Sequence, residues 1–112
     1  LYNNASNWRQ YARTNTTGLH ESMIKEPSMT VAFGEKYEFS QHWYFDYETY
    51  EDYSQLDQQR HGSTQGQSKG SGSNYIYCDG SARYARLGAT FNPINQWAVL
   101  DDWRNIGLHL KP

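Results

Sequence analysis

The stretch RHGSTQGQSKGSGSNYIYCDGSARYARL (Arg60–Leu87) organises the chain, because it contains a clear β-hairpin signal. Two runs rich in residues that favour strands, Asn74–Cys78 and Ser81–Leu87, are joined by Asp79-Gly80. An Asp-Gly pair between such runs is typical of a type I′ turn, in which both central residues have positive φ. The sequence therefore predicts an antiparallel hairpin around this dipeptide.

A two-residue turn also sets the register of the hairpin. Tyr77 then pairs with Ala82, and Tyr75 pairs with Tyr84. Side chains alternate along a strand, and directly paired residues share a face. We therefore expect Tyr75, Tyr77 and Tyr84 on the same face of the sheet.

The segment before the hairpin, Gly62–Ser73, contains four glycines, four serines and no apolar residue. Such a composition cannot bury enough apolar surface to offset the entropy lost on ordering. We expect a flexible surface insert whose two ends come back together where the hairpin begins.

The totals indicate one small domain over residues 1–112, in which 37% of residues are hydrophobic and 16% are aromatic. We expect a modest core built largely from rings. The net charge of −2 argues against nucleic acid as a partner. Residues 1–59 hold four Lys/Arg and nine Asp/Glu, whereas residues 60–112 hold six and three. This division suggests that the two halves pack against each other or against copies of the chain.

Two further strands are expected in the first half of the chain. The continuous apolar run Met29–Phe33 predicts a strand that is covered on both faces and ended by Gly34. The segment Tyr37–Tyr47 alternates with a period of two, which predicts a half-buried strand with a bend near residues 40–42. The rings of one parity are expected to face inward: Tyr37, Phe39, Trp43, Phe45 and Tyr47.

The remaining segments carry weaker signals. Short helical turns are expected at Glu21–Lys25 and at Asp101–Asn105. Leu1–Asn15 has a weak helical stripe and is interpreted as either a short helix or a loop. The acidic segment Glu48–Gln59 is expected to be a loop, and Thr90–Pro112 to pack back over the sheet.

Several of these residues also form a known pattern. Arg60–Gly62 (RHG), followed by Asn74–Gly80 (NYIYCDG), resembles the C-terminal signature of a group of bacterial pseudopilin-like proteins. The signature is Arg-His, a glycine-containing spacer, and then Asn-aromatic-x-Phe-x-Asp-Gly-His. Pro27-Ser28 and Glu35 resemble the segment that precedes it in that group, so the similarity spans about residues 26–99.

The chain departs from this pattern at two places. Seventeen residues, Gly62–Cys78, separate His61 from Asp79, whereas the signature has nine. Ser81 stands where the group has a second His. No role that depends on that second His carries over.

The resemblance implies a pilin-like globular head, an α+β domain dominated by an antiparallel sheet. It implies a non-enzymatic structural subunit of a type II secretion (general secretion pathway) or type IV pilus-like system, with other pseudopilin subunits as partners. Members of the group begin as prepilins with a long hydrophobic N-terminal helix, and this chain has no apolar run of that length. We expect the helix to precede Leu1 in the full-length protein and to anchor it in the inner membrane. The head then belongs to the cell envelope, on its periplasmic or extracellular face.

The residues that carry the resemblance are the candidate structural residues: Glu35, Arg60, His61, Asn74, Asp79 and Gly80. Asp79 is interpreted as a turn residue, whereas Arg60 and His61 bond to neighbouring backbone or to a buried carboxylate. Glu35 is the candidate for that carboxylate. A remote alternative is a hydrolase in which His61 and Asp79 form an orienting pair, but no preorganised nucleophile accompanies them.

No cofactor is expected. The four histidines and the single cysteine lack the short paired spacing of zinc sites. Calcium is the remaining metal candidate, because it accepts flexible carboxylate ligands. The acidic run that offers such ligands consists of Asp46, Glu48, Glu51 and Asp52. The other interpretation of this run is a solvated face.

Two further features have more than one interpretation. Cys78 is the only cysteine, which excludes an internal disulfide and favours a small buried hydrophobe over a reactive thiol. The ten Tyr and four Trp leave a second class of function open, a secreted carbohydrate-binding β-domain in which exposed rings stack on sugars. That function requires exposed rings, whereas the alternation of residues 37–47 predicts inward ones.

Overall fold

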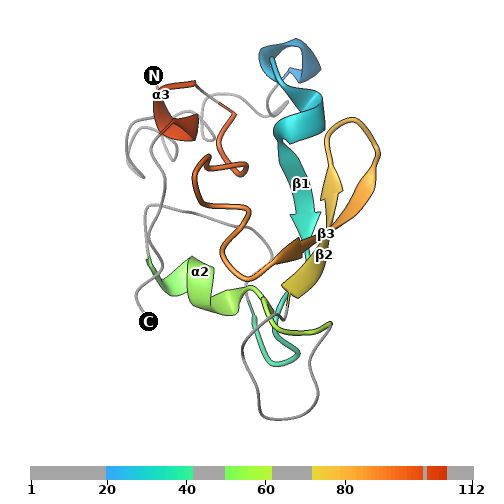
Figure 1. The fold of residues 1–112 in the computed structure, drawn as a ribbon, viewed down its shortest axis with the longest axis vertical. Coiled ribbons are helices and arrows are strands. Elements are labelled where there is room, and N and C mark those ends of the chain that lie inside the picture. The colour runs from blue at the N-terminus through green and yellow to red at the C-terminus, as the bar shows by residue number, and fades with distance from the viewer. Residues whose placement is uncertain (1–19, 42–49, 62–71, 100, 106–112) are drawn as a thin grey trace.

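The computed structural model describes residues 20–41, 50–61, 72–99 and 101–105. These residues form a small three-stranded antiparallel sheet with a few short helices (Figure 1). The strands are β1 (Val31–Gly34), β2 (Gly72–Tyr77) and β3 (Ala82–Arg86), and their order in the sheet is β1-β2-β3. The predicted antiparallel sheet is therefore present, with β2 at its centre.

The helical elements within the described residues are all short. Two 3-10 turns, η1 (Glu21–Met23) and η2 (Pro27–Met29), precede β1, and the prediction of a turn near residue 21 is confirmed. The α-helices are α2 (Tyr50–Gln55) and α3 (Asp101–Arg104), the second of which was expected. Helix α2 lies in the acidic segment for which a loop was predicted, so that prediction is wrong.

The hairpin between β2 and β3 is present, but its turn is longer by one residue than predicted. The Tyr77 N–H donates to the Ser81 carbonyl and the Gly80 N–H donates to the Tyr77 carbonyl, both at 2.9 Å. Three residues therefore connect the strands, and of these only Gly80 has positive φ, at 83°. This is the pattern of a type I turn followed by a left-handed glycine, and the predicted type I′ turn is wrong.

The extra turn residue shifts the register by one position. Tyr75 pairs with Arg83, and Asn74 pairs with Tyr84. Since the side-chain period of a strand is two, this shift moves Tyr84 to the opposite face from Tyr75. The prediction of a common face holds for Tyr75 and Tyr77, which are buried, and fails for Tyr84, which is exposed.

Strand β1 is covered on one face only. Val31 is buried, whereas Ala32 and Phe33 are exposed, with Phe33 at 68%. The register slips between Val31 and Phe33, as in a β-bulge, and Phe33 pairs with the exposed Ile76. The expectation that both faces of this strand are covered is therefore wrong, although Gly34 does end it.

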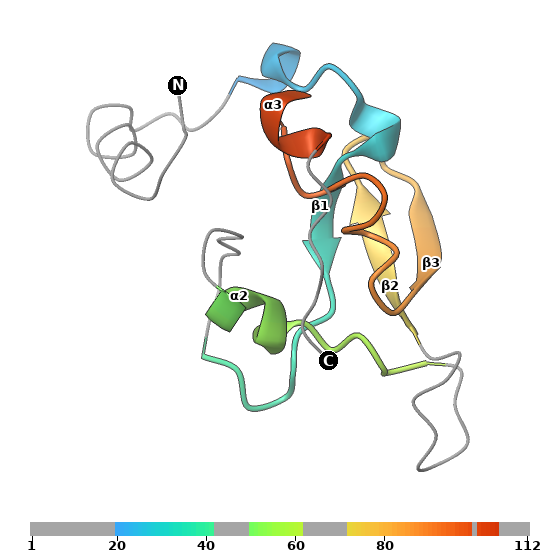
Figure 2. The ribbon, with the colours of Figure 1, turned by 60° about the vertical axis from the view of Figure 1, so that its left-hand side comes forward.

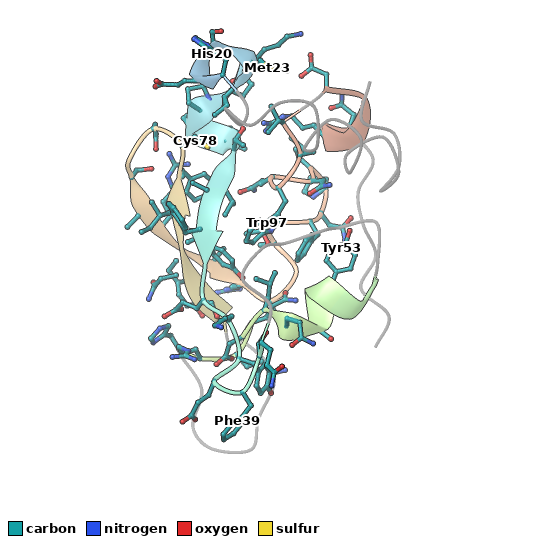
Figure 3. The ribbon with its side chains drawn as sticks, turned by 180° about the vertical axis from the view of Figure 1, so that it is seen from behind. His20, Met23, Phe39, Tyr53, Cys78 and Trp97 are labelled. Carbon is teal, nitrogen blue, oxygen red and sulfur yellow. The ribbon has the colours of Figure 1, made fainter. Side chains whose placement is uncertain are left out.

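The core is built mainly from rings, as predicted. One cluster contains Val31, Tyr75 and Tyr77 on the inner face of the sheet. The other contains Tyr53 of α2, Leu56 and Phe91. Trp97 packs against both clusters, edge-on to Tyr75 and stacked on Phe91. Figure 3 shows Trp97 and Tyr53 on the same side of the sheet.

The segment after β3 crosses the inner face of the sheet and leads to α3 (Figure 2). The Val31 N–H donates to the Gln96 carbonyl at 2.8 Å, which ties this segment to β1. Arg104 of α3 is buried and donates to the Met29 carbonyl at 2.9 Å and to the Thr30 hydroxyl. The expected packing of the closing segment over the sheet is confirmed for residues 90–99 and 101–105.

The predicted strand at residues 37–47 is wrong where the structure describes it. A turn follows Tyr37, closed by a 3.1 Å bond from the Ser40 N–H to the Tyr37 carbonyl. Tyr37 and Phe39 are 55% and 86% exposed, so neither ring faces inward. Trp43, Phe45, Tyr47 and residues 1–15 lie outside the described residues.

The insert is shorter than predicted. Gly72 and Ser73 belong to β2 and are buried, which leaves residues 62–71 between His61 and the sheet. The two ends of this segment meet as expected, because His61 and Gly72 exchange backbone hydrogen bonds of 2.9 and 3.0 Å. Ser73 also donates its hydroxyl to the Asp57 carbonyl, which fixes the start of β2 to the preceding segment.

Candidate functional site

Glu35, His61 and Asn74 converge just beyond the end of β1. One Glu35 carboxylate oxygen, Oε1, lies 2.9 Å from His61 Nε2. The other, Oε2, accepts a 2.8 Å hydrogen bond from the Asn74 N–H. The proposed partnership of Glu35 and His61 is therefore present. We call Glu35, Arg60, His61 and Asn74 the Glu35 cluster.

The backbone explains why a carboxylate is useful at this position. The pairing of β1 with β2 ends at Gly34 and Tyr75, so the next residue of β2 toward its start, Asn74, lies beyond the last pair. Its N–H bonds to Glu35 Oε2. Because a backbone donor without a partner is costly, the Glu35 side chain extends the ladder by one bond.

Arg60 reinforces the same junction without touching Glu35. Its Nη2 donates to the Lys36 carbonyl at 3.0 Å, and its Nε donates to Asp57 Oδ2 at 3.0 Å. His61 therefore binds the side chain of Glu35, and Arg60 binds the backbone of the next residue, Lys36. An additional contact comes from β3, where the Tyr84 hydroxyl donates to the His61 carbonyl at 3.4 Å.

The charges around Glu35 favour its ionised form. Partial burial works to raise the pKa of this carboxyl, but the bonds from His61 and the Asn74 N–H outweigh it. The positive charges of His61 and Arg60 act in the same direction. The net result is a Glu35 pKa below its ordinary value of 4.5.

Asp79 and Gly80 occupy the turn at the other end of β2. Asp79 Oδ1 accepts hydrogen bonds from the Ser81 hydroxyl at 2.7 Å and the Ser81 N–H at 2.9 Å, and Oδ2 accepts from Arg83 at 3.2 Å. The bonds from Ser81 lower the pKa of Asp79, and Arg83 adds to this effect. The Ser81 side chain thus holds the turn through Asp79.

The structure does not bring His61 and Asp79 together. His61 pairs with Gly72 at the first residue of β2, whereas Asp79 follows its last residue. A strand rises about 3.3 Å per residue, so the length of β2 separates the two side chains. The carboxylate beside His61 is that of Glu35, and the His61–Asp79 pair required by the hydrolase alternative is not formed.

Three features were not anticipated from the sequence. Arg104 is buried, and its Nε has no hydrogen-bond partner. The Arg83 guanidinium carbon lies 4.3 Å from the centre of the Tyr77 ring, a cation–π contact. His20 Nδ1 lies 2.8 Å from the Ser22 hydroxyl and accepts from the Ser22 N–H at 3.3 Å, as a cap of η1. Only the Arg83 contact could be found from the alternation of side chains along β3, and only after the register of the hairpin is known.

The metal candidates are not built into a site within the described residues. Asp46 and Glu48 lie outside them, and the side chains of Glu51 and Asp52 are not described. Among the described side chains, no group of three or more His, Cys, Asp or Glu could hold an ion. Cys78 is a partly buried free thiol whose pKa is raised, first by burial and then by Asp79.

Two rings that were expected in the core lie at the surface instead. Phe39 projects from the end of the molecule, away from Trp97 and the core (Figure 3). Tyr37 is the second exposed ring of the same turn. On the outer face of the sheet, Phe33 and Tyr84 are also exposed.

Comparison with known proteins found no match to this chain among family models, curated proteins or solved structures. Within the described part of the chain, no helix is long and apolar enough to cross a membrane.

Proposed function

We propose that this chain is the globular head of a pseudopilin-like structural subunit without enzymatic activity. In this proposal the head has a pilin-like fold and supplies lateral contacts in a type II secretion or type IV pilus-like assembly. Its partners are other pseudopilin subunits, and the full-length protein is held in the inner membrane by a helix encoded before Leu1.

The proposal rests on where the structure places the residues of the shared pattern. Glu35, Arg60, His61 and Asn74 are separated by up to 39 positions and meet at one end of β2. Asp79 and Gly80 form the turn at its other end. Each of them makes at least one hydrogen bond that involves backbone, which supports a structural role for the pattern in holding the sheet.

This arrangement also accounts for the long spacer. Residues 62–71 leave from His61 and return to its partner Gly72, so an insertion there leaves the sheet unchanged. Loop length has only a weak effect on closure entropy, about 0.6 kcal/mol per doubling. The spacing of seventeen residues between His61 and Asp79, in place of nine, is therefore compatible with the same arrangement at this end of the sheet.

The test is the coding sequence upstream of Leu1, followed by expression of the full-length protein with a prepilin peptidase. We expect a short basic leader, a Gly-Phe-like junction and about 20 apolar residues, enough to span a bilayer. Mass spectrometry should then show cleavage at that junction, and substitution of its glycine should prevent it. An upstream sequence that lacks the apolar segment would refute the proposal.

A carbohydrate-binding domain is the second candidate, and the exposure of Tyr37 and Phe39 favours it. Exposed rings can stack on sugar faces, and these two lie on the same turn. Titration with oligosaccharides, followed by tyrosine and tryptophan fluorescence, tests it. Binding that is lost in Tyr37→Ala and Phe39→Ala but kept in Tyr84→Ala would support this function, and unchanged fluorescence would exclude the oligosaccharides tested.

A further inference from the structure

We propose that Glu35, His61 and the Asn74 amide form an acid-sensitive clasp, which holds the Asn74 amide in neutral solution and releases it in acid. The clasp does not depend on the proposed function, because it follows from hydrogen bonds within the domain. It joins three segments that are distant in sequence: the exit of β1, the residue before segment 62–71, and the start of β2.

The two oxygens of Glu35 are divided between two partners. Oε1 faces the His61 ring, and Oε2 accepts from the Asn74 N–H. A proton on either oxygen turns an acceptor into a hydroxyl group and removes the negative charge. One protonation event therefore weakens both contacts, since hydrogen bonds to ionised acceptors are the stronger ones.

Other hydrogen bonds also cross this junction, but none of them pairs the Asn74 amide: the Asp57 N–H donates to the Glu35 carbonyl at 2.9 Å, Arg60 donates to the Lys36 carbonyl, and Ser73 donates to the Asp57 carbonyl. Beyond the clasp, His61 is held by its two backbone bonds to Gly72 and by the long contact from Tyr84. The Glu35 and His61 side chains are 28% and 43% exposed, so protons and water reach them from solution. Protonation of Glu35 can therefore release the Asn74 amide locally, while these other bonds keep the neighbouring segments in place.

The charged groups around the clasp favour the ionised carboxylate. Arg60 and His61 contribute positive charge, and Asp57 is paired with Arg60 at 3.0 Å. Lys36 directs its ammonium group to the Ser40 carbonyl, 2.9 Å away. The titratable groups that β2 and β3 contribute at positions 72–75 and 84–86 are Tyr75, Tyr84 and Arg86, the last of which pairs with Gly72.

The direction of the response follows from linkage. The Glu35 pKa is lowered in the folded state, so the carboxylate contributes stability that is fully present above the unfolded pKa, near 4.5. This contribution is lost as the pH falls through the folded pKa. The clasp is therefore closed at neutral pH and released in acid, below about pH 4.5.

Amide hydrogen exchange measured by NMR between pH 6 and pH 3 tests the clasp in the intact chain. We expect the protection factor of the Asn74 amide to fall about ten-fold, the scale of one charge-assisted bond at a partly exposed position. The Tyr77 amide, which donates to Ser81 at the far end of β2, should keep its protection. If both amides lose protection in parallel, the response is global acid unfolding and the clasp proposal is wrong.

Two variants separate the clasp from other acid effects. In Glu35→Gln the side chain still accepts a hydrogen bond but cannot be protonated in this range, so the response of Asn74 should disappear. Asp57→Asn, a matched change at a neighbouring carboxylate, should retain it. A response that persists in Glu35→Gln overturns the proposal.

His61→Gln gives a second measurement should Glu35→Gln fail to fold, as judged by its fluorescence spectrum at pH 6. Because His61 lowers the Glu35 pKa, its removal should move the midpoint of the Asn74 response to higher pH. An unchanged midpoint would show that His61 takes no part in the clasp.

Discussion

At the scale of single residues, two glycines are required for different physical reasons. Gly80 has a φ of 83° and open space around its missing Cβ, so its requirement is conformational. A Cβ on Gly72 would instead collide with the Ala85 carbonyl, so its requirement is steric. The requirement for Gly80 was visible in the sequence, because Asp-Gly is a turn signal. The requirement for Gly72 was not visible, because it depends on the register of β2 and β3.

The first prediction concerns Gly80. We expect Gly80→Val to lower the free energy of unfolding by about 1–3 kcal/mol, because a β-branched residue is strained at positive φ. Gly80→Asn should cost less, since Asn tolerates this region better. Urea denaturation followed by fluorescence measures both, and equal stability of Gly80→Val and the parent would contradict the assigned turn.

The second prediction concerns Gly72. Gly72→Ala should destabilise the domain by about 1–3 kcal/mol, the usual cost of overpacking, because backbone atoms of β3 cannot move aside without breaking the ladder. Gly80→Ala is the comparison that separates the two causes, because its new methyl group meets nothing within 4 Å and any loss of stability comes from the positive φ alone. Circular dichroism during urea unfolding compares the two variants, and a neutral Gly72→Ala would show that the register at the start of β2 is wrong.

The third prediction follows from the burial of Tyr75, which raises its pKa to about 12. Above pH 10 the unfolded tyrosine loses its proton while the buried one keeps it, so stability falls as the pH rises from 10 toward 12. Tyr75→Phe should show a flatter dependence of stability on alkaline pH, because the buried group that titrates is removed. Exposed Tyr37→Phe serves as the control and should keep the slope of the parent.

At the scale of elements, the hairpin shows what a local signal can and cannot determine. The alternation in Asn74–Tyr77 and the Asp-Gly dipeptide were enough to predict two paired strands. They did not distinguish a two-residue turn from a three-residue one, because both place glycine at positive φ. The choice is made by tertiary contacts: the Cys78 and Asp79 N–H groups donate to the Thr30 and Pro27 carbonyls.

The segment at residues 37–41 shows the opposite failure, since a regular period of two did not produce a strand. Alternation of polar and aromatic side chains does not by itself supply a neighbouring strand, which the backbone N–H and C=O groups of a strand require. Here the backbone bonds locally and to the segment after α2, with the Tyr37 N–H donating to Gln55. The Glu35 cluster, by contrast, was anticipated through the shared pattern, whereas the bond from Glu35 to Asn74 required the coordinates.

The fourth prediction tests the element boundary at the insert. Deleting residues 63–70 leaves Gly62 and Ser71 between His61 and Gly72, which is the length of a two-residue hairpin loop. It also restores the nine-residue spacing. Because closure entropy changes by only about 0.6 kcal/mol per halving of length, we expect the melting temperature to be kept or slightly raised. Unfolding of the variant would show that the deleted residues contribute structure.

At the scale of the whole molecule, the inner face of the sheet is covered and the outer face is not. Phe33, Ile76 and Tyr84 lie on that outer face at 68%, 46% and 46% exposure. Composition could predict a core of rings, but it could not show which rings would stay outside. That distinction depends on the bulge in β1 and on the one-residue shift of β3.

The last prediction concerns association of the isolated chain, and it rests on the size of this outer row. A buried ring contributes about 150–250 Å², so three partly exposed side chains offer roughly 300 Å². A stable interface needs roughly 800 Å² from each partner. We therefore expect a monomer at micromolar concentration that associates weakly as the concentration rises, with Phe33→Ser reducing the weak association. Sedimentation velocity over a hundred-fold concentration range measures this. A tight oligomer whose size does not change with concentration would show that the head has an interface larger than this outer row.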